Sequence, residues 1–185
     1  MLHDLLFALW YFIPAGVANV TPILAAQAPF LKNWDAPVDG GRKWRGKRIF
    51  DDHKTWRGVI TGVIAGVLVL WLQLNLVTQH NWTQTLNLPS DYLTASIVLL
   101  GFLLSFGALF GDMLKSLAKR QIGVPAGKSW FPFDQLDYIA GGLILSSFYI
   151  QLTLSQYIWI IIVWFGMHLL FSYIGYLTKF KASPI

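Results

Sequence analysis

The chain has 185 residues, of which 55% are hydrophobic and only 12% are charged, and it contains neither cysteine nor glutamate. Soluble domains carry about 25% charged residues, so this composition argues against an ordinary soluble protein. The absence of cysteine excludes disulfides and thiol chemistry. The apolar residues lie in long runs, which is typical of an all-α integral membrane protein with one domain over residues 1–185.

Five apolar runs are long enough to predict membrane-spanning helices. They cover residues 5–28, 58–77, 93–111, 138–154 and 156–178. Crossing the hydrocarbon core takes about 20 helical residues, so the fourth run is short but adequate. The first run ends in Ala-Gln-Ala, which resembles a signal-peptide cleavage site. The residues before this run are not basic and the run is too long, so we expect a retained helix.

Positive charge is distributed unevenly between the two sides that five spans would create. Loops 29–57 and 112–137 and the residues after 178 carry all 14 lysines and arginines, and the opposite side carries none. Lysine and arginine accumulate on the cytoplasmic side of membrane proteins. We therefore predict a multi-pass protein of the cell membrane with two cytoplasmic loops, a cytoplasmic C-terminus and an external N-terminus.

Half of the positive charge lies in one segment, residues 40–58, which we name the flap. Its sequence is GGRKWRGKRIFDDHKTWRG. One interpretation of a basic segment beside a span is that it only fixes the topology, by lying on anionic lipid headgroups. Four aspartates in the same loop argue against a pure lipid anchor, and the glycines and tryptophans are typical of a segment that folds against something.

The second cytoplasmic loop brings carboxylates and cations together. Asp112 lies at the end of the third span, and Lys115 and Lys119 follow at helical spacing, so the three side chains share a face. Asp134 and Asp137 share a face at the start of the fourth span. Because spans joined by a short loop are antiparallel neighbours, we expect three carboxylates and several cations to meet at one membrane surface.

Each of these aspartates also has a structural interpretation. Asp134 could cap a helix, Asp137 could interact with the helix dipole, and Asp112 could pair with a lysine on its own helix. Their combination favours a site, because Mg²⁺ takes carboxylate, phosphate and water oxygens. Phosphoryl and nucleotidyl transfer need positioning and charge neutralisation more than covalent work from the protein. We therefore expect Mg²⁺ and a polyphosphate here.

At these residues the chain resembles the membrane CTP:phosphatidate cytidylyltransferases. Their pattern of basic residues, a Gly/Pro loop and then D-R-x-D at the start of a span corresponds here to SLAKRQIGVPAGKSWFPFDQLD, with Gln135 in place of the arginine. The chain is more similar to the compact five-span archaeal branch, the CDP-archaeol synthases. That similarity lies in the flap, in GD…K…KR…G…DQLD and in ANVTP at residues 18–22, and it covers nearly the whole chain.

The resemblance implies a reaction in which CTP and a lipid phosphate give a CDP-lipid and pyrophosphate. The archaeal members use an unsaturated archaeol phosphate, and phosphatidate is the alternative substrate. The residues that the resemblance assigns to catalysis are Asp112, Asp134, Asp137 and Lys115, with the three aspartates as Mg²⁺ ligands. The residues that it assigns to CTP or the lipid phosphate are Asp39, Arg42, Lys54, Thr55, Arg57, Lys119 and Arg120.

Polar and small residues inside the spans complete the prediction. Asn19 lies within the first span, where a polar residue usually faces the interior of the bundle, either for a hydrogen bond between helices or for a substrate site. Glycines recur at G-x-x-x-G spacing, which predicts close helix packing. These glycines are Gly58, Gly62 and Gly66 in the second span, and Gly107 and Gly111 in the third.

Two functions without catalysis would also fit a small basic membrane protein. An anion carrier would place its polar residues near the middle of the membrane, on broken helices within repeats. Here the charges lie at one surface and no repeat is present. A lipid-binding scaffold leaves three aspartates at two span ends unexplained. Neither alternative accounts for the cluster as well as the function that the resemblance implies, a Mg²⁺-dependent CTP:lipid-phosphate cytidylyltransferase that works in the lipid bilayer. We expect no nucleic acid partner.

Overall fold

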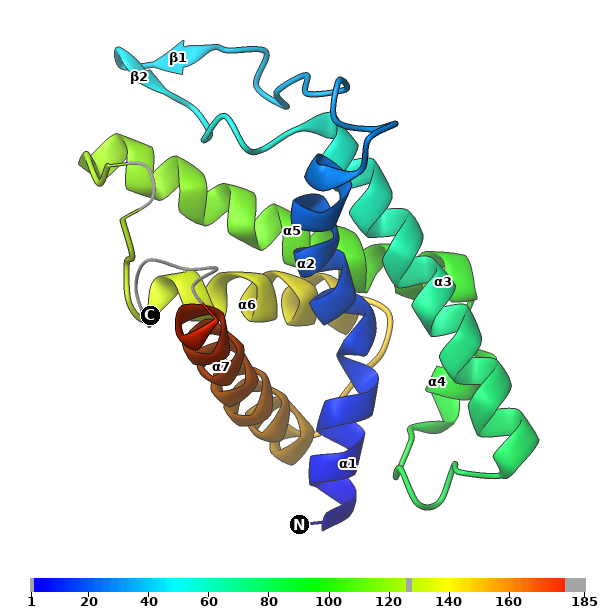
Figure 1. The fold of residues 1–185 in the computed structure, drawn as a ribbon. Coiled ribbons are helices and arrows are strands. Elements are labelled where there is room, and N and C mark those ends of the chain that lie inside the picture. The colour runs from blue at the N-terminus through cyan, green and yellow to red at the C-terminus, as the bar shows by residue number, and fades with distance from the viewer. Residues whose placement is uncertain (1, 126–127, 179–185) are drawn as a thin grey trace.

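The computed structural model describes residues 2–125 and 128–178. These residues form helices and one small antiparallel hairpin, arranged as Figure 1 shows. In chain order the elements are α1 (Leu2–Tyr11), α2 (Ile13–Gln27), β1 (Lys43–Trp44), β2 (Lys47–Arg48), α3 (Trp56–His80), α4 (Ser90–Thr94), α5 (Ile97–Ile122), α6 (Phe133–Ser147) and α7 (Leu154–Leu177). The predicted all-α architecture is confirmed, with the hairpin as a small addition in the flap.

Within the described residues, four helical segments are long and apolar enough to cross a membrane. The first consists of α1 and α2 together, and the other three are α3, α5 and α7. The chain is therefore a multi-pass membrane protein. α6 has 15 residues. At 1.5 Å per residue its length is about 22 Å, which is less than the hydrocarbon core of about 30 Å. The fifth crossing, expected over residues 138–154, is not confirmed as a complete helix.

The connection between α6 and α7 explains why α6 is short. α6 ends at Ser147 rather than at residue 154, and residues 148–153 lead to α7. The Thr153 hydroxyl accepts from the Gln156 N–H at 3.3 Å, and the Gln156 side chain accepts from the Thr153 N–H at 2.9 Å. This reciprocal capping box satisfies two free backbone donors and starts a new helix at Leu154.

α5 continues well beyond the predicted end of the third span at residue 111. It ends at Ile122, where Gly123 takes the left-handed conformation (φ +84°) that commonly closes a helix. The first part of the expected loop 112–137 is therefore helical. Asp112 and Lys115 lie on this helix, so their spacing fixes them on one face, as the sequence indicated.

Glycines allow α2 and α3 to approach at the level of the backbone. A Cβ atom on Gly62 would lie 2.8 Å from the Ala18 carbonyl oxygen, and one on Gly66 would lie 2.9 Å from the Pro14 carbonyl oxygen. Both distances are shorter than a normal carbon–oxygen contact, so only glycine fits without movement. The close packing predicted from the second span is confirmed.

The contact between α5 and α6 follows the same principle and bears on the site. A Cβ atom on Gly107 would lie 2.5 Å from the Gly141 carbonyl oxygen, and one on Gly111 would lie 2.2 Å from the Asp137 carbonyl oxygen. The first turns of α6 therefore rest directly on the backbone of α5. Because Asp112 follows Gly111, this contact brings carboxylates from the two helices together.

α7 covers α1 and the start of α6. The Trp164 indole N–H donates to the Ala8 carbonyl at 2.8 Å, and the Tyr138 hydroxyl donates to the Trp164 carbonyl at 3.1 Å. Figure 1 shows the connection after α6 leading to the end of the molecule where α1 begins, from which α7 returns. The N-terminal ends of α1 and α7 therefore lie at the end of the molecule opposite the flap.

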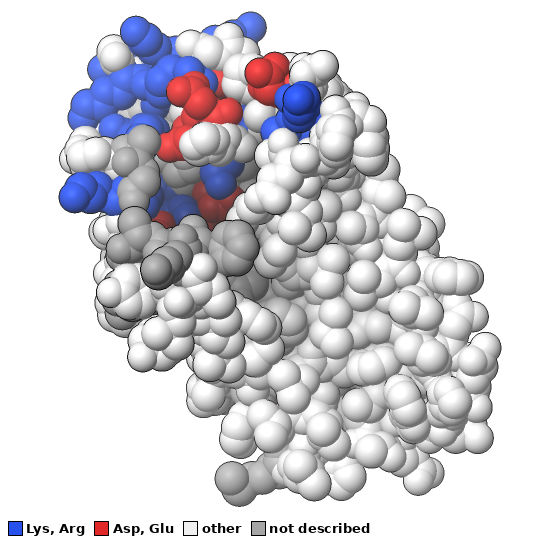
Figure 2. Space-filling view, viewed as in Figure 1, with Lys and Arg blue, Asp and Glu red and all other residues white. Residues whose placement is uncertain are grey.

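Charge and apolar surface are segregated along the molecule. On the face drawn in Figure 2, lysine, arginine and aspartate gather at the end where the flap and the last turns of α5 lie. Large apolar side chains are exposed along α3, among them Ile64, Leu68 and Trp71. Such a surface would be unfavourable in water, whereas lipid chains cover it without cost. The arrangement agrees with a membrane protein that has one polar end.

Candidate active site

A tight turn shapes the flap. β1 and β2 pair Lys43 with Arg48 and Trp44 with Lys47, which leaves a two-residue loop. Both loop residues have positive φ, 52° at Arg45 and 78° at Gly46. This is the backbone that a two-residue hairpin turn requires, and glycine adopts it without strain. Gly46 therefore allows the flap to turn back on itself at this point.

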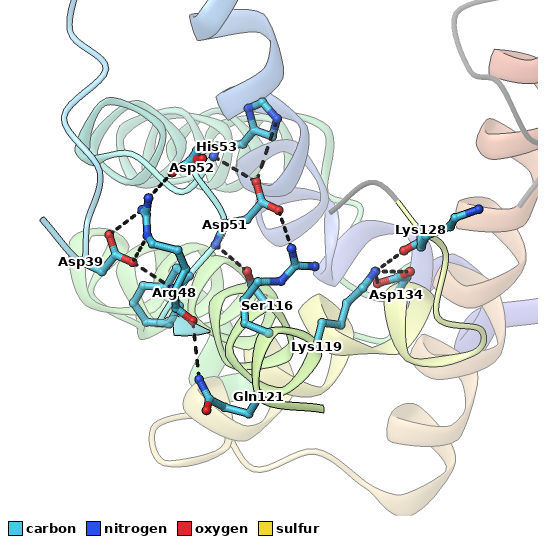
Figure 3. Close-up of polar contacts among 12 residues, drawn as sticks. Asp39, Arg48, Asp51, Asp52, His53, Ser116, Lys119, Gln121, Lys128 and Asp134 are labelled. Carbon is cyan, nitrogen blue, oxygen red and sulfur yellow. Dashed lines mark hydrogen bonds and ion pairs between the residues drawn. The ribbon is translucent and has the colours of Figure 1, made fainter. Parts of the chain in front are cut away.

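Asp39 lies immediately before the flap and organises its base. Its carboxylate accepts hydrogen bonds from the N–H groups of Gly41 at 2.9 Å and Phe50 at 3.0 Å. The Arg48 guanidinium lies 3.0 Å from the same carboxylate (Figure 3). Burial by itself raises the pKa of Asp39, but the two N–H groups and the guanidinium outweigh it and hold the pKa below its usual value.

The flap is docked on α5. The Asp51 N–H donates to the Ser116 hydroxyl at 3.0 Å, and the Asp51 carboxylate lies 3.6 Å from the Arg120 guanidinium. Figure 3 shows Asp51 directed toward α5 in this way. The Lys47 ammonium donates to the Gln121 carbonyl at 2.7 Å. The flap thus folds against a helix, as its composition predicted.

Lys115 lies at the centre of the three predicted metal ligands. Its Nζ atom is 3.0 Å from Asp112 Oδ1 and 3.0 Å from Asp134 Oδ1. It is 2.8 Å from Asp137 Oδ2. The structure therefore brings together the carboxylates of two helices around one ammonium group, and the predicted convergence is confirmed.

Two further lysines border this cluster. The Lys54 ammonium, at the end of the flap, forms an ion pair with Asp112. The Lys119 ammonium lies 3.1 Å from both oxygens of Asp134. Three carboxylates therefore face three ammonium groups, so the formal charges in the cluster balance. An anionic ligand and a cation would have to enter together to preserve that balance.

Asp134 is not the N-cap of α6, because Pro132 occupies that position and no side chain caps the helix. Its carboxylate instead accepts from the Trp130 N–H and pairs with Lys115 and Lys119. Burial by itself raises the pKa of Asp134, but the Trp130 hydrogen bond and the lysines outweigh it and hold the pKa below its usual value. Asp134 is therefore a carboxylate at neutral pH and suited to bind cations.

A cavity of about 800 Å³ lies between the flap, α2, α3, α5 and α6. The carboxylate–lysine cluster forms part of its wall, and Figure 2 shows aspartates beside lysines and arginines at this end of the molecule. The residues predicted from sequence that line the cavity are Asn19, Lys54, Thr55, Arg57, Asp112, Lys115, Asp134 and Asp137.

Thr55 and Arg57 also hold the start of α3 in place. The Thr55 hydroxyl caps the helix by accepting from the Gly58 N–H at 3.3 Å. The Arg57 guanidinium donates to the carbonyls of Leu31 and Lys32 at 3.1 and 3.0 Å. These bonds join α3 to the segment after α2, so both residues shape the cavity whether or not they contact a substrate.

The other predicted residues lie outside the cavity lining. The Asp39 carboxylate is bonded to Phe50 of the flap, and the Arg42 side chain is exposed. Arg120 pairs with Asp51, and Lys119 lies behind Asp134, where it also donates to the Lys128 carbonyl. Substrate contacts of these four residues stay predictions, because the structure gives each of them another position or partner.

The cavity also has polar lining residues that the sequence prediction missed. They are Gln27, Asp35, Asp52, His53 and His168. Gln27 lies two helical turns after Asn19 on α2, so helical spacing could have identified it. Asp52 and His53 directly precede Lys54 in the flap. Nothing in their spacing distinguishes them from solvated loop residues, and the His53 side chain is 94% exposed.

The cluster has carboxylate oxygens of the kind that the predicted Mg²⁺ would need. Among residues 2–125 and 128–178, no three His or carboxylate side chains are already placed to enclose a metal ion. The point toward which the aspartates converge holds Lys115 Nζ. The donor set nevertheless fits, because carboxylate oxygens beside cationic groups are what Mg²⁺ and a polyphosphate require.

The chain is similar to known proteins over its whole length. A family model described as CDP-archaeol synthase, CarS-like, matches residues 1–185. The chain belongs to the CDP-archaeol synthase family. A CDP-archaeol synthase from Thermococcus onnurineus is 36% identical over 184 residues, which cover 99% of this chain and 98% of that one. One from Sulfolobus acidocaldarius is 32% identical over 182 residues, which cover 97% and 98%.

A solved structure has a fold similar to that of this chain. It is described as an intramembrane enzyme for archaeal membrane lipids biosynthesis, and it matches this chain with a TM-score of 0.69 and 27% sequence identity. The match covers 88% of this chain and 90% of that one. The resemblance to CDP-archaeol synthases inferred from the flap and the aspartate motifs is therefore confirmed over nearly the full length.

Proposed function

We propose that the chain is a membrane cytidylyltransferase that transfers CMP from CTP to an archaeol-type lipid phosphate, giving CDP-archaeol and pyrophosphate. Membership of the CDP-archaeol synthase family supports the reaction. The observation that carries the site is the cluster of Asp112, Asp134 and Asp137 around Lys115 in the wall of the cavity. A cavity of about 800 Å³ is within the range of small-molecule sites.

The three aspartates would hold the Mg²⁺ that the family resemblance implies. When bound, Mg²⁺ neutralises phosphate oxygens and helps pyrophosphate to leave. The lysines of the cavity act beside it. Lys54 and Lys115 line the cavity, so their ammonium groups can contact the phosphates and hold the α-phosphorus in position. In this division the aspartates hold the metal ion and the lysines orient the phosphates.

The transfer itself needs no general base from the protein. An oxygen of the lipid phosphate attacks the α-phosphorus of CTP, the bond from that phosphorus to the bridging oxygen breaks, and pyrophosphate leaves with the electron pair. The attacking phosphate is already an anion, so no proton has to be removed. The chain's task is therefore to bring two polyanions together, which agrees with the lysines in the wall of the cavity.

We infer that the flap and the cavity face the cytoplasm and that the N-terminus lies outside. The uneven distribution of lysine and arginine supports this orientation. It also matches the supply of CTP, which is a cytoplasmic metabolite. The lipid phosphate reaches the same end of the protein from within the bilayer, since the charged end adjoins helices with exposed apolar side chains.

The activity is tested with the purified protein in detergent. We expect pyrophosphate release when CTP, Mg²⁺ and an archaeol-type lipid phosphate are all present, and little release when any one is omitted. Phosphatidate is the comparison substrate for the alternative that the enzyme acts on diacyl lipids. Absence of release with both lipid phosphates would contradict the proposed reaction.

Replacement of a predicted metal ligand tests the cluster. We expect Asp134→Asn to reduce turnover by at least about 100-fold, because it removes a charge at the point where the phosphates are neutralised. The matched control is Asp91→Asn in α4, an exposed aspartate outside the cavity lining, which should leave turnover unchanged. Near-normal turnover of Asp134→Asn would remove Asp134 from the proposed site.

A further inference from the structure

Lys115 has an unusual position for a lysine in a phosphate-binding site. Its Nζ atom lies within 3.0 Å of an oxygen from each of Asp112, Asp134 and Asp137, and its side chain is 15% exposed. Lys54 and Lys119 each pair with one of these aspartates. Among the described residues, Lys115 is thus the cation shared by all three carboxylates.

Three carboxylates that converge on one point repel one another and require a cation. In the described arrangement the Lys115 ammonium supplies that charge. A metal ion held by the same oxygens would have to occupy the same point, because the ammonium nitrogen already lies at hydrogen-bonding distance from all three. A lysine and a metal ion therefore cannot both occupy the centre of the cluster.

We propose that Lys115 is an internal counter-ion that competes with Mg²⁺ for the three aspartates, and that Mg²⁺ binding releases its ammonium group to a phosphate in the cavity. This inference rests on the proposed function. Lys115 lines the cavity, and its side chain is long and flexible, so the group can exchange partners without movement of α5. The lysine thereby links metal binding to phosphate binding.

The competition has a thermodynamic consequence. Without nucleotide, Mg²⁺ must displace the Lys115 ammonium and therefore binds weakly. A nucleoside triphosphate gives the released ammonium a new partner, so Mg²⁺ and nucleotide each strengthen the binding of the other. This coupling would keep the site from holding a bare metal ion before the triphosphate arrives.

The test measures metal binding to the purified protein without nucleotide. Mn²⁺ is the probe, because it prefers the same oxygen ligands as Mg²⁺ and its free concentration can be followed by electron paramagnetic resonance. We expect Lys115→Met, which keeps the side-chain length but removes the charge, to bind Mn²⁺ on the order of tenfold more tightly than the natural protein. Lys43→Met, at an exposed position of β1, is the control and should leave the affinity unchanged.

Pyrophosphate release by the same proteins separates this inference from the proposed function. A residue that only stabilises the fold would lose metal binding and activity together, whereas Lys115→Met should bind Mn²⁺ more tightly and yet release pyrophosphate more slowly. Lys115→Ala provides a second variant if the methionine side chain disturbs packing. Equal, weaker or undetectable Mn²⁺ binding by both folded variants would overturn the competition, even if the natural protein is an active cytidylyltransferase.

Discussion

Asp39 illustrates how a carboxylate in a basic segment can serve the fold. Its side chain is 1% exposed and its carboxylate is bonded to the Gly41 and Phe50 N–H groups and to Arg48. The flap that follows carries seven lysines and arginines, which repel one another. A buried anion at its base offsets that repulsion and fixes the direction in which the chain leaves. This role is independent of any substrate contact.

The charge of Asp39 predicts a pH-dependent stability. Its folded-state pKa is lowered from the usual value of about 4, so the stabilisation is present above that value and is lost as the pH falls through the folded-state pKa. We expect Asp39→Asn to lower the unfolding temperature at neutral pH. The difference from the natural protein should shrink as the pH falls below about 4. A difference that does not change with pH would contradict this interpretation.

At the scale of elements, the contact between the flap and α5 determines where Lys54 lies. Asp51 bonds to Ser116 and pairs with Arg120, and Lys54 follows Asp51 by three residues and reaches Asp112. We therefore expect Arg120 to act on the cavity through the flap, as a positioning residue. This differs from the phosphate contact that the family resemblance implies for Arg120.

A double-mutant cycle tests the positioning role. We expect Asp51→Asn and Arg120→Gln each to raise the KM for CTP by about two- to fivefold with a small effect on kcat, since partly exposed ion pairs contribute up to about 1 kcal/mol. Because both variants remove the same contact, the double variant should resemble either single one. Arg45→Gln, at the flap turn, is the control and should have no effect. Additive losses would indicate that Arg120 contacts the substrate itself.

The sequence predicts the parts of the cluster that lie on regular helices. It does not predict the contacts that irregular segments make. The spacing of Asp112 and Lys115, and of Asp134 and Asp137, follows from helix geometry alone. The docking of Asp51 on Ser116 joins residues far apart in the chain, and no local pattern encodes such a contact. For the same reason, the sequence did not reveal that Lys115 lies between the carboxylates of both helices.

At the scale of the whole molecule, the arrangement of the helices determines how many times the chain crosses the membrane. α6 is too short for a complete crossing, yet residues 148–153 lead away from the flap end (Figure 1). Hydrophobic runs predicted the longer spans well because length and apolar character suffice for them. The capping box at Thr153, which shortens the fourth run, is visible in the sequence as Thr-x-x-Gln but lies inside an apolar stretch that conceals it.

Single cysteines can determine the topology directly, because the chain contains no native cysteine. We expect a membrane-impermeant maleimide to label Gln84→Cys, in the loop between α3 and α4, in intact cells. Lys47→Cys in the flap should be labelled only after the membrane is opened. Gln151→Cys, in the connection after α6, should be labelled from outside if α6 and that connection together complete the fifth crossing.

The three positions also provide their own controls. Labelling of all of them after the membrane is opened would show that each cysteine is reactive. Labelling of Lys47→Cys in intact cells would reverse the proposed orientation. Protection of Gln151→Cys in intact cells would contradict the proposed fifth crossing.

The glycine contact between α5 and α6 has a consequence for the precision of the site. Gly111 rests against the Asp137 carbonyl, and the next residue, Asp112, carries one of the converging carboxylates. The contact that determines the distance between the two helix axes therefore lies directly beside the charged groups. A single methyl group added there would widen the gap between the carboxylates. The main-chain contact thus determines the distance between the carboxylates, and it leaves no room for even one additional carbon atom.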